Sequence, residues 1–319
     1  MKHEPIKLRA VFMGTSEFAA TILVSLVKEN YNLIAVYTQP DKKAGRDQEV
    51  KESAVKIIAE ENKIPVFQPT KLNEETVTGL KNQKPDLIIV AAYGKILPKE
   101  VLEIPGFGAI NVHASILPRF RGPSPIQNAI LSGETETGIT IMLMDKGIDT
   151  GDILRERSLK IKPDETTPEL SKRLSELASK LLLETLPLWI ERKITPRKQD
   201  DSKATLCQLI EKTDGKIIWA DSAESIYNKF RAFRPWPGIY TFWEVGNSIK
   251  RTKLNKIKLA ENISKEHHLG EVFRHDKDIA IQADPGAIII EEIQMEGKPS
   301  VKIQDFLNGY PNFIGSILK

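Results

Sequence analysis

The sequence predicts an α/β protein in which a Rossmann-like doubly wound parallel sheet is followed by a small OB-like β-barrel domain. The first part alternates short apolar runs with segments of helical periodicity, the pattern of parallel strands joined by helices. The last part has short alternating segments separated by turn signals such as Gly246-Asn247, which is typical of a small barrel. We therefore expect one domain over residues 1–194, an exposed charged linker over 195–206 and the barrel domain over 207–319.

The expected elements of the first domain follow in order along the chain. The apolar run at residues 8–13 leads through Gly14 into a helix at 17–28, which opens a βαβ unit. This turn lacks the three glycines of G-x-G-x-x-G, so binding of NAD or FAD is not indicated. Further strands are expected at residues 33–38, 65–68, 86–93, 109–114, 136–145 and 153–161, and further helices at 52–62, 73–83, 98–102, 123–131 and 167–192.

Two further regions remain, the polar segment at residues 39–50 and the strands of the barrel. Residues 39–50 are polar and contain Pro40 and Gly45, so we expect no helix there. Strands of the barrel are expected at residues 239–245, 250–259, 270–273, 279–283 and 287–294.

Basic residues gather in the predicted barrel domain, although the net charge of the chain is only +3. Clustered charge matters more than the total, because phosphate binding is local and charges are screened within about 10 Å. The cluster contains Lys229, Arg231, Arg234, Lys250, Arg251, Lys253, Lys256 and Lys258.

Composition limits the class of protein. The hydrophobic fraction of 40% and the charged fraction of 28% are typical of soluble globular proteins. No apolar run reaches the roughly 20 residues of a membrane span, and the start MKHEPIKLRA has no apolar signal core. The single Cys207 excludes an internal disulfide framework and a cysteine-based metal cluster, so we expect an incidental thiol in a cytoplasmic protein. The composition supplies no interface signal, and we expect a monomer.

Two polar side chains share one face of the strand expected at residues 109–114. Asn111 and His113 are two positions apart, and such residues face the same side of a strand. Doubly wound sheets bind ligands outside the carboxyl ends of their strands, where both residues lie. Asp149, in a Gly/Asp-rich loop, can approach from a neighbouring loop. An amide donor, a base and a carboxylate are sufficient for acyl transfer or for a hydrolysis.

Each of these side chains suits a separate chemical role. Imidazole titrates at about 6.5, so His113 can accept a proton at neutral pH, and Asp149 would orient it. Asn111 can donate to a developing oxyanion. The alternative is a histidine of the core. A Ser115 nucleophile is disfavoured because Gly-x-Ser-x-Gly is absent, and we expect no metal because His113 has no His or Cys at ligand spacing.

Several segments resemble the methionyl-tRNA formyltransferase family, in the same order and over almost the whole chain. They are FMGTSEFA at residues 12–19, TQPDKKAGR at 38–46, NVHASILPRFRG at 111–122, MDKGIDTGD at 144–152 and FRAFRPWPG at 230–238. The N-x-H and D-x-x-x-D-x-G-D pieces alone indicate only the wider group of transferases that use 10-formyltetrahydrofolate.

The resemblance implies a transferase that moves a formyl group from 10-formyltetrahydrofolate to the α-amino group of methionine on initiator tRNA, for translation initiation. By position it assigns catalysis to Asn111, His113 and Asp149. The folate-binding tetrapeptide of the family, usually SLLP, is matched by Ser115, Ile116, Leu117 and Pro118.

The resemblance also implies how tRNA is held. The loop at residues 39–50 would reach the acceptor end of the tRNA through Arg46, with Lys42 and Lys43 beside it. Asp47 and Glu49 stand where the family commonly has a glycine and lysines, and acidic groups there would repel phosphate. Apart from the resemblance, the basic cluster of the C-terminal domain itself leads us to expect that Arg231, Arg234 and Lys253 bind backbone phosphates.

Two other functions stay open at this stage. A related transferase could formylate a small amine, such as a nucleotide sugar or glycinamide ribonucleotide, although Arg46 and the basic C-terminal domain disfavour it. A folate-binding protein could instead release formate, or catalyse nothing. A missing member of the Asn111, His113 and Asp149 set would favour that reading, and all three are present.

Overall fold

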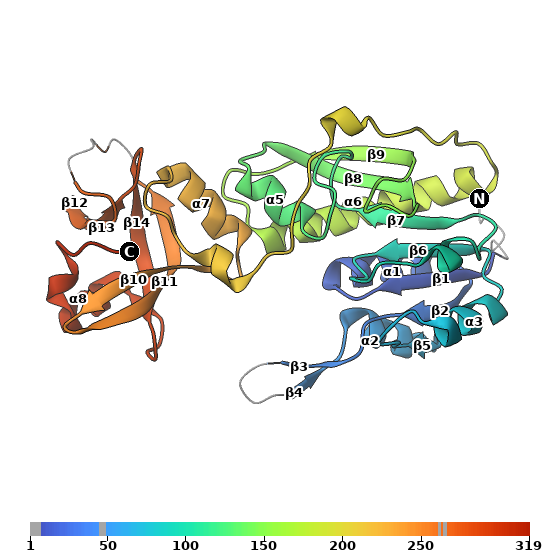
Figure 1. The fold of residues 1–319 in the computed structure, drawn as a ribbon, viewed down its shortest axis with the longest axis horizontal. Coiled ribbons are helices and arrows are strands. Elements are labelled where there is room, and N and C mark those ends of the chain that lie inside the picture. Colours follow the sequence, from blue (N-terminus) through green and yellow to red (C-terminus); the bar gives the residue numbers. More distant parts are fainter. Residues whose placement is uncertain (1–7, 45–48, 261–262, 264–266) are drawn as a thin grey trace. The chain divides into compact units, whose positions relative to one another are not determined.

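The computed structural model describes residues 8–44, 49–260, 263 and 267–319. The chain forms two compact units, drawn in Figure 1. The first contains Met1–Pro125, Glu136–Lys160 and Leu170–Gln208, and the second contains Ile126–Thr135, Ile161–Glu169 and Leu209–Lys319. The segment expected to be a linker, residues 195–206, falls within the first unit. Among the described residues, we find no helix with both the length and the hydropathy needed to cross a bilayer.

A seven-stranded sheet forms the centre of the first unit. Its order is β5-β2-β1-β6-β7-β8-β9, with β1 (Ala10–Gly14), β2 (Leu33–Tyr37), β5 (Val66–Phe67), β6 (Leu87–Ala91), β7 (Ala109–His113), β8 (Glu136–Leu143) and β9 (Ile153–Lys160). The strands from β5 to β7 are parallel, whereas β8 and β9 run antiparallel to their neighbours. The Rossmann-like fold class is confirmed, but the sheet is parallel-rich and not wholly parallel. The loop at 144–152 is too short for the crossover that would make β8 and β9 parallel.

Helices cover both faces of this sheet. They are α1 (Glu17–Lys28), α2 (Ala54–Glu61), α3 (Glu74–Asn82), α4 (Lys99–Leu102) and, from Leu170 onwards, α6 (Thr167–Ile190). The remaining helix of this part of the chain, α5 (Pro125–Leu131), belongs to the second unit from Ile126 onwards. On one face α1 contacts β1 and β6, and on the other Leu80 of α3 and Val101 of α4 pack with Val11 and Ile88. Every residue of β1 and of β6 is therefore buried, as their continuous apolar runs predict.

The polar segment after β2 forms a two-stranded ribbon outside the main sheet (Figure 1). Strand β3 (Lys42–Ala44) pairs antiparallel with β4 (Glu49–Lys51), and Lys43 lies opposite Val50 in the register. The absence of a helix here was predicted, but the ribbon was not. Arg46 and Asp47 lie in the connection at 45–48, outside the described residues.

The second unit is built on an antiparallel sheet with the order β10-β11-β14-β13-β12, to which β15 adds by pairing with β14. Its strands are β10 (Ile239–Val245), β11 (Ser248–Leu259), β12 (Val272–His275), β13 (Asp278–Gln282), β14 (Ala287–Met295) and β15 (Val301–Lys302). The five long segments predicted as barrel strands are confirmed with small shifts at their ends. Two helices, α7 (Ala223–Ala232) and α8 (Ile303–Gly309), were not predicted. From the sequence alone, the charged residues of α7 are expected to belong to the barrel.

The two edge strands of the antiparallel sheet are linked by the segment 315–319. The main chains of Lys319 and Phe242, in β10, exchange two hydrogen bonds of 2.9 Å. On the other side, Leu318 N donates to Gly270 O at 2.9 Å and Gly315 N donates to the carbonyl of Val272, in β12, at 2.7 Å. This segment therefore curls the sheet towards a barrel, which agrees with the predicted class of the second domain.

The linking segment gives a direct test of its contribution. Leu318 is 2% exposed and its neighbour Ile317 is 49% exposed. We expect Leu318→Ala to lower the free energy of unfolding of the second unit by about 2–5 kcal/mol, because a buried apolar side chain is lost. Ile317→Ala should cost much less. Denaturant unfolding followed by tryptophan fluorescence compares the two variants, and equal losses would contradict the assigned role of the segment.

Candidate active site

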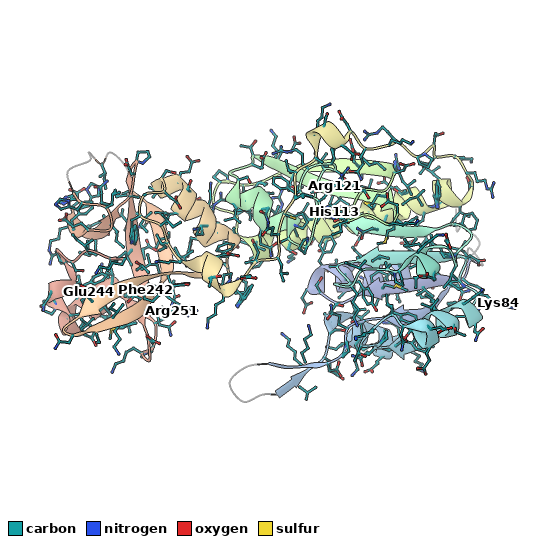
Figure 2. The ribbon with its side chains drawn as sticks, in the orientation of Figure 1. Lys84, His113, Arg121, Phe242, Glu244 and Arg251 are labelled. Atoms are coloured by element: carbon teal, nitrogen blue, oxygen red, sulfur yellow. The ribbon has the colours of Figure 1, made fainter. Side chains whose placement is uncertain are left out.

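The three residues predicted for catalysis come from one strand and one loop. Asn111 and His113 lie on β7, and His113 is its last residue, at the carboxyl end of the strand. Asp149 lies in the loop that joins β8 to β9, and a hydrogen bond of 2.9 Å from Leu143 N to Asp152 O closes this loop. The structure brings the three side chains together in the region labelled by His113 in Figure 2.

The carboxylate of Asp149 is the centre of this cluster. Its Oδ1 accepts a hydrogen bond from Asn111 Nδ2 at 3.1 Å, and its Oδ2 accepts one from Gly122 N at 2.9 Å. The same Oδ2 lies 3.5 Å from His113 Nδ1. The side chains of His113 and Asp149 are only 6% and 14% exposed, so water screens their interaction weakly. One carboxylate thus fixes the relative positions of an amide, an imidazole and a peptide N–H.

The two ring nitrogens of His113 have different partners. Nε2 lies 2.9 Å from the carbonyl oxygen of Phe120. A carbonyl only accepts, so Nε2 carries a hydrogen and donates it. Nδ1 is then the nitrogen that gains or loses a proton, and it faces Asp149. Proton exchange at His113 therefore takes place on the side of the carboxylate.

The loop that carries Asp149 is held in a tight conformation. Asp149 has φ +53°, in the left-handed region that non-glycine residues occupy at a cost of about 1–3 kcal/mol. Asp145 Oδ1 braces the loop by accepting from Gly147 N at 3.0 Å and from Thr150 Oγ1 at 2.6 Å. A Cβ at Gly151 would come within 1.8 Å of Leu143 O, so only glycine fits there. The backbone around Asp149 is set by packing and not by the preference of the residue itself.

The predicted folate-binding tetrapeptide follows directly on β7. Thr140, buried in β8, donates from Oγ1 to Ser115 O at 2.7 Å and accepts from Leu117 N at 3.1 Å. Leu117 packs in a small apolar cluster, while Ile116 and Pro118 are half-buried. Thr140 therefore fixes the backbone of the tetrapeptide, and the two half-buried side chains remain partly accessible to a ligand.

Ser115 does not have the surroundings of a catalytic nucleophile. Its side chain is buried, and Oγ donates to Arg119 O at 2.6 Å. Cys207 is also buried, and burial raises the pKa of its thiol. A thiol that stays protonated is a poor nucleophile. Neither side chain has surroundings that would activate it.

The residues predicted to bind tRNA are placed in different environments. Lys42 lies in β3, Lys43 is described only by its backbone in the same strand, and Arg46 lies outside the described residues. In the second unit, the exposed Arg234 lies with its guanidinium 5.4 Å from the Phe230 ring centroid. Lys253 is half-buried in β11, and burial together with the nearby Arg251 and Lys212 lowers the pKa of Lys253.

Arg231 points into the protein in this structure. It is 6% exposed, its Nη1 donates to Glu165 O at 3.1 Å and its Nη2 donates to Asn228 Oδ1 at 2.5 Å. Burial also lowers the pKa of this guanidinium. The bonds to Glu165 and Asn228 give Arg231 a structural role within the second unit and do not favour a phosphate contact.

Sequence reasoning did not find the peptide N–H of Gly122 or the side chains that support the Asp149 loop. A main-chain donor leaves no residue-type signal, because every residue except proline has one. The position of Gly122 does have a sequence trace. Its φ is +118°, and a Cβ there would come within 2.3 Å of Cys207 O, so glycine is needed.

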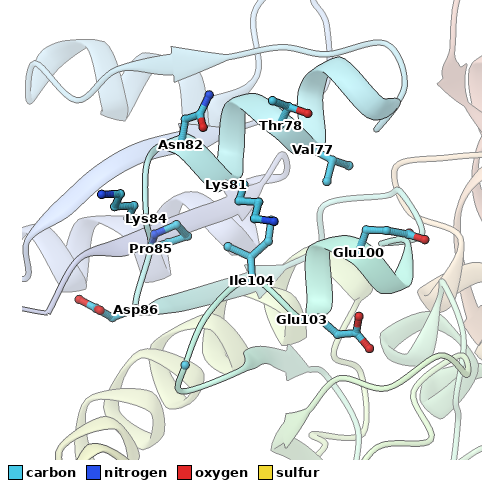
Figure 3. A pocket seen from close by; sticks show the side chains of 11 residues that line it. Val77, Thr78, Lys81, Asn82, Lys84, Pro85, Asp86, Glu100, Glu103 and Ile104 are labelled. Atoms are coloured by element: carbon cyan, nitrogen blue, oxygen red, sulfur yellow. The ribbon is translucent and has the colours of Figure 1, made fainter.

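A separate pocket of about 860 Å³ opens beside α3 and α4 (Figure 3). Its lining mixes both signs of charge, with Lys81 and Lys84 against Glu100 and Glu103. None of its lining residues belongs to the candidate site, and Asp86 in its wall directly precedes the amino end of β6. Within the described part of the chain, no group of three or more His, Cys, Asp or Glu residues could hold a metal ion.

Comparison with known families first gives the class of protein. A family model described as formyl transferase matches residues 8–186, and a model described as formyl transferase, C-terminal domain, matches residues 209–311. A solved N-formyltransferase from Helicobacter canadensis, in complex with folinic acid and dTDP-3-aminofucose, shares the fold. Its TM-score is 0.65 at 20% identity, and the match covers 89% of this chain and 98% of that chain.

Curated relatives then identify the family more closely. The methionyl-tRNA formyltransferase of Caldicellulosiruptor saccharolyticus is 45% identical over 97% of this chain and 99% of that protein. The one of Caldanaerobacter subterraneus subsp. tengcongensis is 44% identical over 98% of this chain and 100% of that protein. The solved methionyl-tRNA formyltransferase from Clostridium thermocellum matches with TM-score 0.53 at 21% identity, over 80% and 95% of the two chains. This chain belongs to the methionyl-tRNA formyltransferase family.

The role of Thr140 in holding the tetrapeptide can be tested by Thr140→Val. The substitution keeps the volume but removes the partner of Ser115 O and Leu117 N. Buried polar groups without a partner cost about 1–3 kcal/mol, and we expect the free energy of unfolding of the first unit to fall by about that amount. Thr21→Val is the matched control, because Thr21 Oγ1 bonds within α1, to Glu17 O at 3.1 Å. Equal stability of the two variants in urea unfolding would show that Thr140 does not hold the tetrapeptide.

Proposed function

We propose that the protein transfers the formyl group of 10-formyltetrahydrofolate to the α-amino group of methionine on initiator tRNA. The first unit would carry the chemistry and the second would bind the RNA. The observation that carries this proposal is the assembly of Asn111, His113 and Gly122 around the carboxylate of Asp149. Relatedness to methionyl-tRNA formyltransferases over nearly the whole chain supports the choice of acceptor.

The reaction needs little activation of the nucleophile, because a free α-amino group has a pKa of about 7.7–8. In the proposed mechanism its lone pair attacks the formyl carbon, and the carbonyl electrons move to the oxygen. An amide has two N–H donors, and Asp149 Oδ1 uses one of Asn111's. The second is available to the oxyanion, and such a contact contributes about 10²–10³ in rate.

One proton must leave the attacking amine and reach the departing nitrogen of the folate. We propose that it is held between His113 Nδ1 and Asp149 Oδ2, which lie 3.5 Å apart. Asp149 is the more exposed of the two, so the proton enters and leaves by its carboxylate. When the tetrahedral intermediate collapses, the bond from carbon to the folate nitrogen breaks and that nitrogen takes up the proton. No electron is gained or lost overall.

The donor would lie against the tetrapeptide Ser115–Pro118. Ser115 Oγ and Leu117 N are already bonded inside the protein. The half-buried side chains of Ile116 and Pro118 are then the parts that contact the folate.

We assign the RNA contacts to cations of both units. Lys42, Lys43 and Arg46 belong to the β3–β4 ribbon and its connection, and Arg234 and Lys253 belong to the second unit. Arg231 is left out because its guanidinium bonds to Glu165 and Asn228. We also propose that the protein acts as a monomer in the cytoplasm.

Transfer of labelled formyl from 10-formyltetrahydrofolate to Met-tRNA, with small amines in competition, separates the proposed function from the alternatives. The proposal requires labelled Met-tRNA and little labelled small amine. Preferred formylation of a nucleotide-sugar amine would overturn the choice of acceptor. Release of formate without any labelled acceptor would overturn transfer altogether.

For His113→Ala we expect kcat for Met-tRNA to fall by about 10²–10⁴, because the group that holds the proton is lost. Folate affinity, measured by calorimetry, should be largely kept. His268→Ala is the matched control, because His268 is exposed in the second unit. Unchanged turnover in His113→Ala rejects the proton assignment.

The basic residues of β11 give a prediction on RNA binding. Lys253 lies near Arg251 and Lys212, whereas Lys258 Nζ is 2.6 Å from Glu291, which offsets its charge. We therefore expect Lys253→Gln to weaken Met-tRNA binding and to reduce the slope of log K against log salt by about 1. Lys258→Gln should change the slope less. The same slope in wild type and Lys253→Gln would reject Lys253 as a phosphate contact.

A further inference from the structure

Residues 197–207, here called the strap, lie along the two loops that form the candidate site. At one end, Arg197 exchanges two main-chain hydrogen bonds with Ile153, of 2.8 and 2.9 Å, just after the Asp149 loop. At the other end, Thr205 O accepts from Arg121 N at 2.9 Å and Thr205 Oγ1 accepts from Phe120 N at 2.8 Å. Phe120 is the residue whose carbonyl binds His113. The strap therefore joins the loop that holds His113 to the loop that holds Asp149.

Between these two ends, Gln199 reaches into the Asp149 loop. Its Nε2 donates to Asp149 O and to Gly151 O, both at 2.8 Å. These carbonyls lie on both sides of Thr150, so the amide holds the backbone at the point where Asp149 has φ +53°. A backbone in the left-handed region persists only when its surroundings hold it there. Gln199 supplies that constraint through both of its N–H groups.

The orientation of Gln199 is fixed in turn by Arg121, which is labelled in Figure 2. Gln199 Oε1 accepts from Arg121 Nε at 3.0 Å and from Arg121 Nη2 at 2.8 Å. Arg121 is 6% exposed, and its Nη2 also lies 2.6 Å from Asp201 Oδ1. The amide oxygen therefore must face the guanidinium, and its N–H groups must face the loop. Gln199 therefore connects Arg121 to the Asp149 loop by directed hydrogen bonds and does more than fill space.

We infer that Gln199 is a positioning residue, which holds the Asp149 backbone so that its carboxylate meets Asn111, His113 and Gly122. The inference rests on the proposed function, because it gives Gln199 a role through Asp149. Releasing the two carbonyls would let the loop relax from its left-handed conformation. A displacement of about 1 Å at a reacting group can cost about 10²-fold in rate. The loss would appear in the chemical step and not in binding.

Gln199→Glu separates positioning from simple packing. The glutamate keeps an acceptor for Arg121 but removes both donors to Asp149 O and Gly151 O. Gln199→Met removes the donors and the acceptor together. The controls on the same strap are Ser202→Ala, which is neutral and exposed, and Lys198→Gln, which changes the net charge by the same amount as Gln199→Glu. All four variants are assayed with Met-tRNA and 10-formyltetrahydrofolate, and their thermal unfolding is measured.

We expect Gln199→Glu to stay folded at the assay temperature, with an unfolding temperature below that of the wild type because two carbonyls lose their donors. Its kcat should fall about 10- to 100-fold while KM for both substrates changes little. Hydrogen exchange in the peptide covering residues 143–152 should become faster in Gln199→Glu and not in Ser202→Ala. In an Asp149→Asn background, Gln199→Glu should add almost no further loss, because both changes act on one group. The two control variants should keep the kcat of the wild type.

Wild-type kcat and unchanged exchange in Gln199→Glu would overturn the inference, and so would a full additional loss in the Asp149→Asn background. These results differ from a failure of the proposed function, in which the wild type itself would not transfer formyl to Met-tRNA. If Gln199→Met unfolds, Gln199→Glu and the exchange measurement still decide the question.

Discussion

The negative charge of Asp149 is the constraint on which the rest of the candidate site depends. One oxygen accepts from Asn111, and the other accepts from Gly122 N and lies beside His113. A carboxylate that is largely buried is costly unless hydrogen bonds and opposite charge surround it. Asn111 and Gly122 supply two such hydrogen bonds, and the same contacts set the geometry that the chemistry uses. The contacts that stabilise the buried carboxylate are therefore the same contacts that arrange the site.

The sheet supplies the rigid part of this arrangement, and a loop supplies Asp149. β7 sits within a sheet covered on both faces, so Asn111 and His113 have a rigid base. Asp149 arrives on a loop whose backbone is strained and must be held. Asp145 braces it from within, and Gln199 holds it from the strap. A polar segment of the first unit, expected from the sequence to be a linker, thus serves the geometry of the candidate site.

The sequence predicted those parts of the molecule that depend on local pattern. Asn111 and His113 follow from the two-residue period of a strand, and the parallel-rich sheet follows from alternating apolar runs. The pattern of apolar runs does not give the direction of a strand, so it does not predict that β8 runs antiparallel to β7; only the short loop at 144–152 indicates the antiparallel pairing of β8 with β9. Gln199 escaped prediction because its segment is polar and charged, as linkers are, and its partners are main-chain carbonyls. Arg231 was placed on the surface because burial of an arginine follows from distant partners such as Glu165.

The central claim is that Asp149 and Phe120 fix the imidazole of His113, with Nε2 always protonated and Nδ1 exchanging its proton beside the carboxylate. Nitrogen NMR of the protein labelled at histidine tests it most directly, with His113→Ala used to assign the signal. The account predicts that neutral His113 is the Nε2–H form across the pH titration, and that Asp149→Asn disturbs the Nδ1 signal more than the Nε2 signal. A neutral form protonated at Nδ1, or a His113 spectrum that Asp149→Asn leaves unchanged, would contradict it.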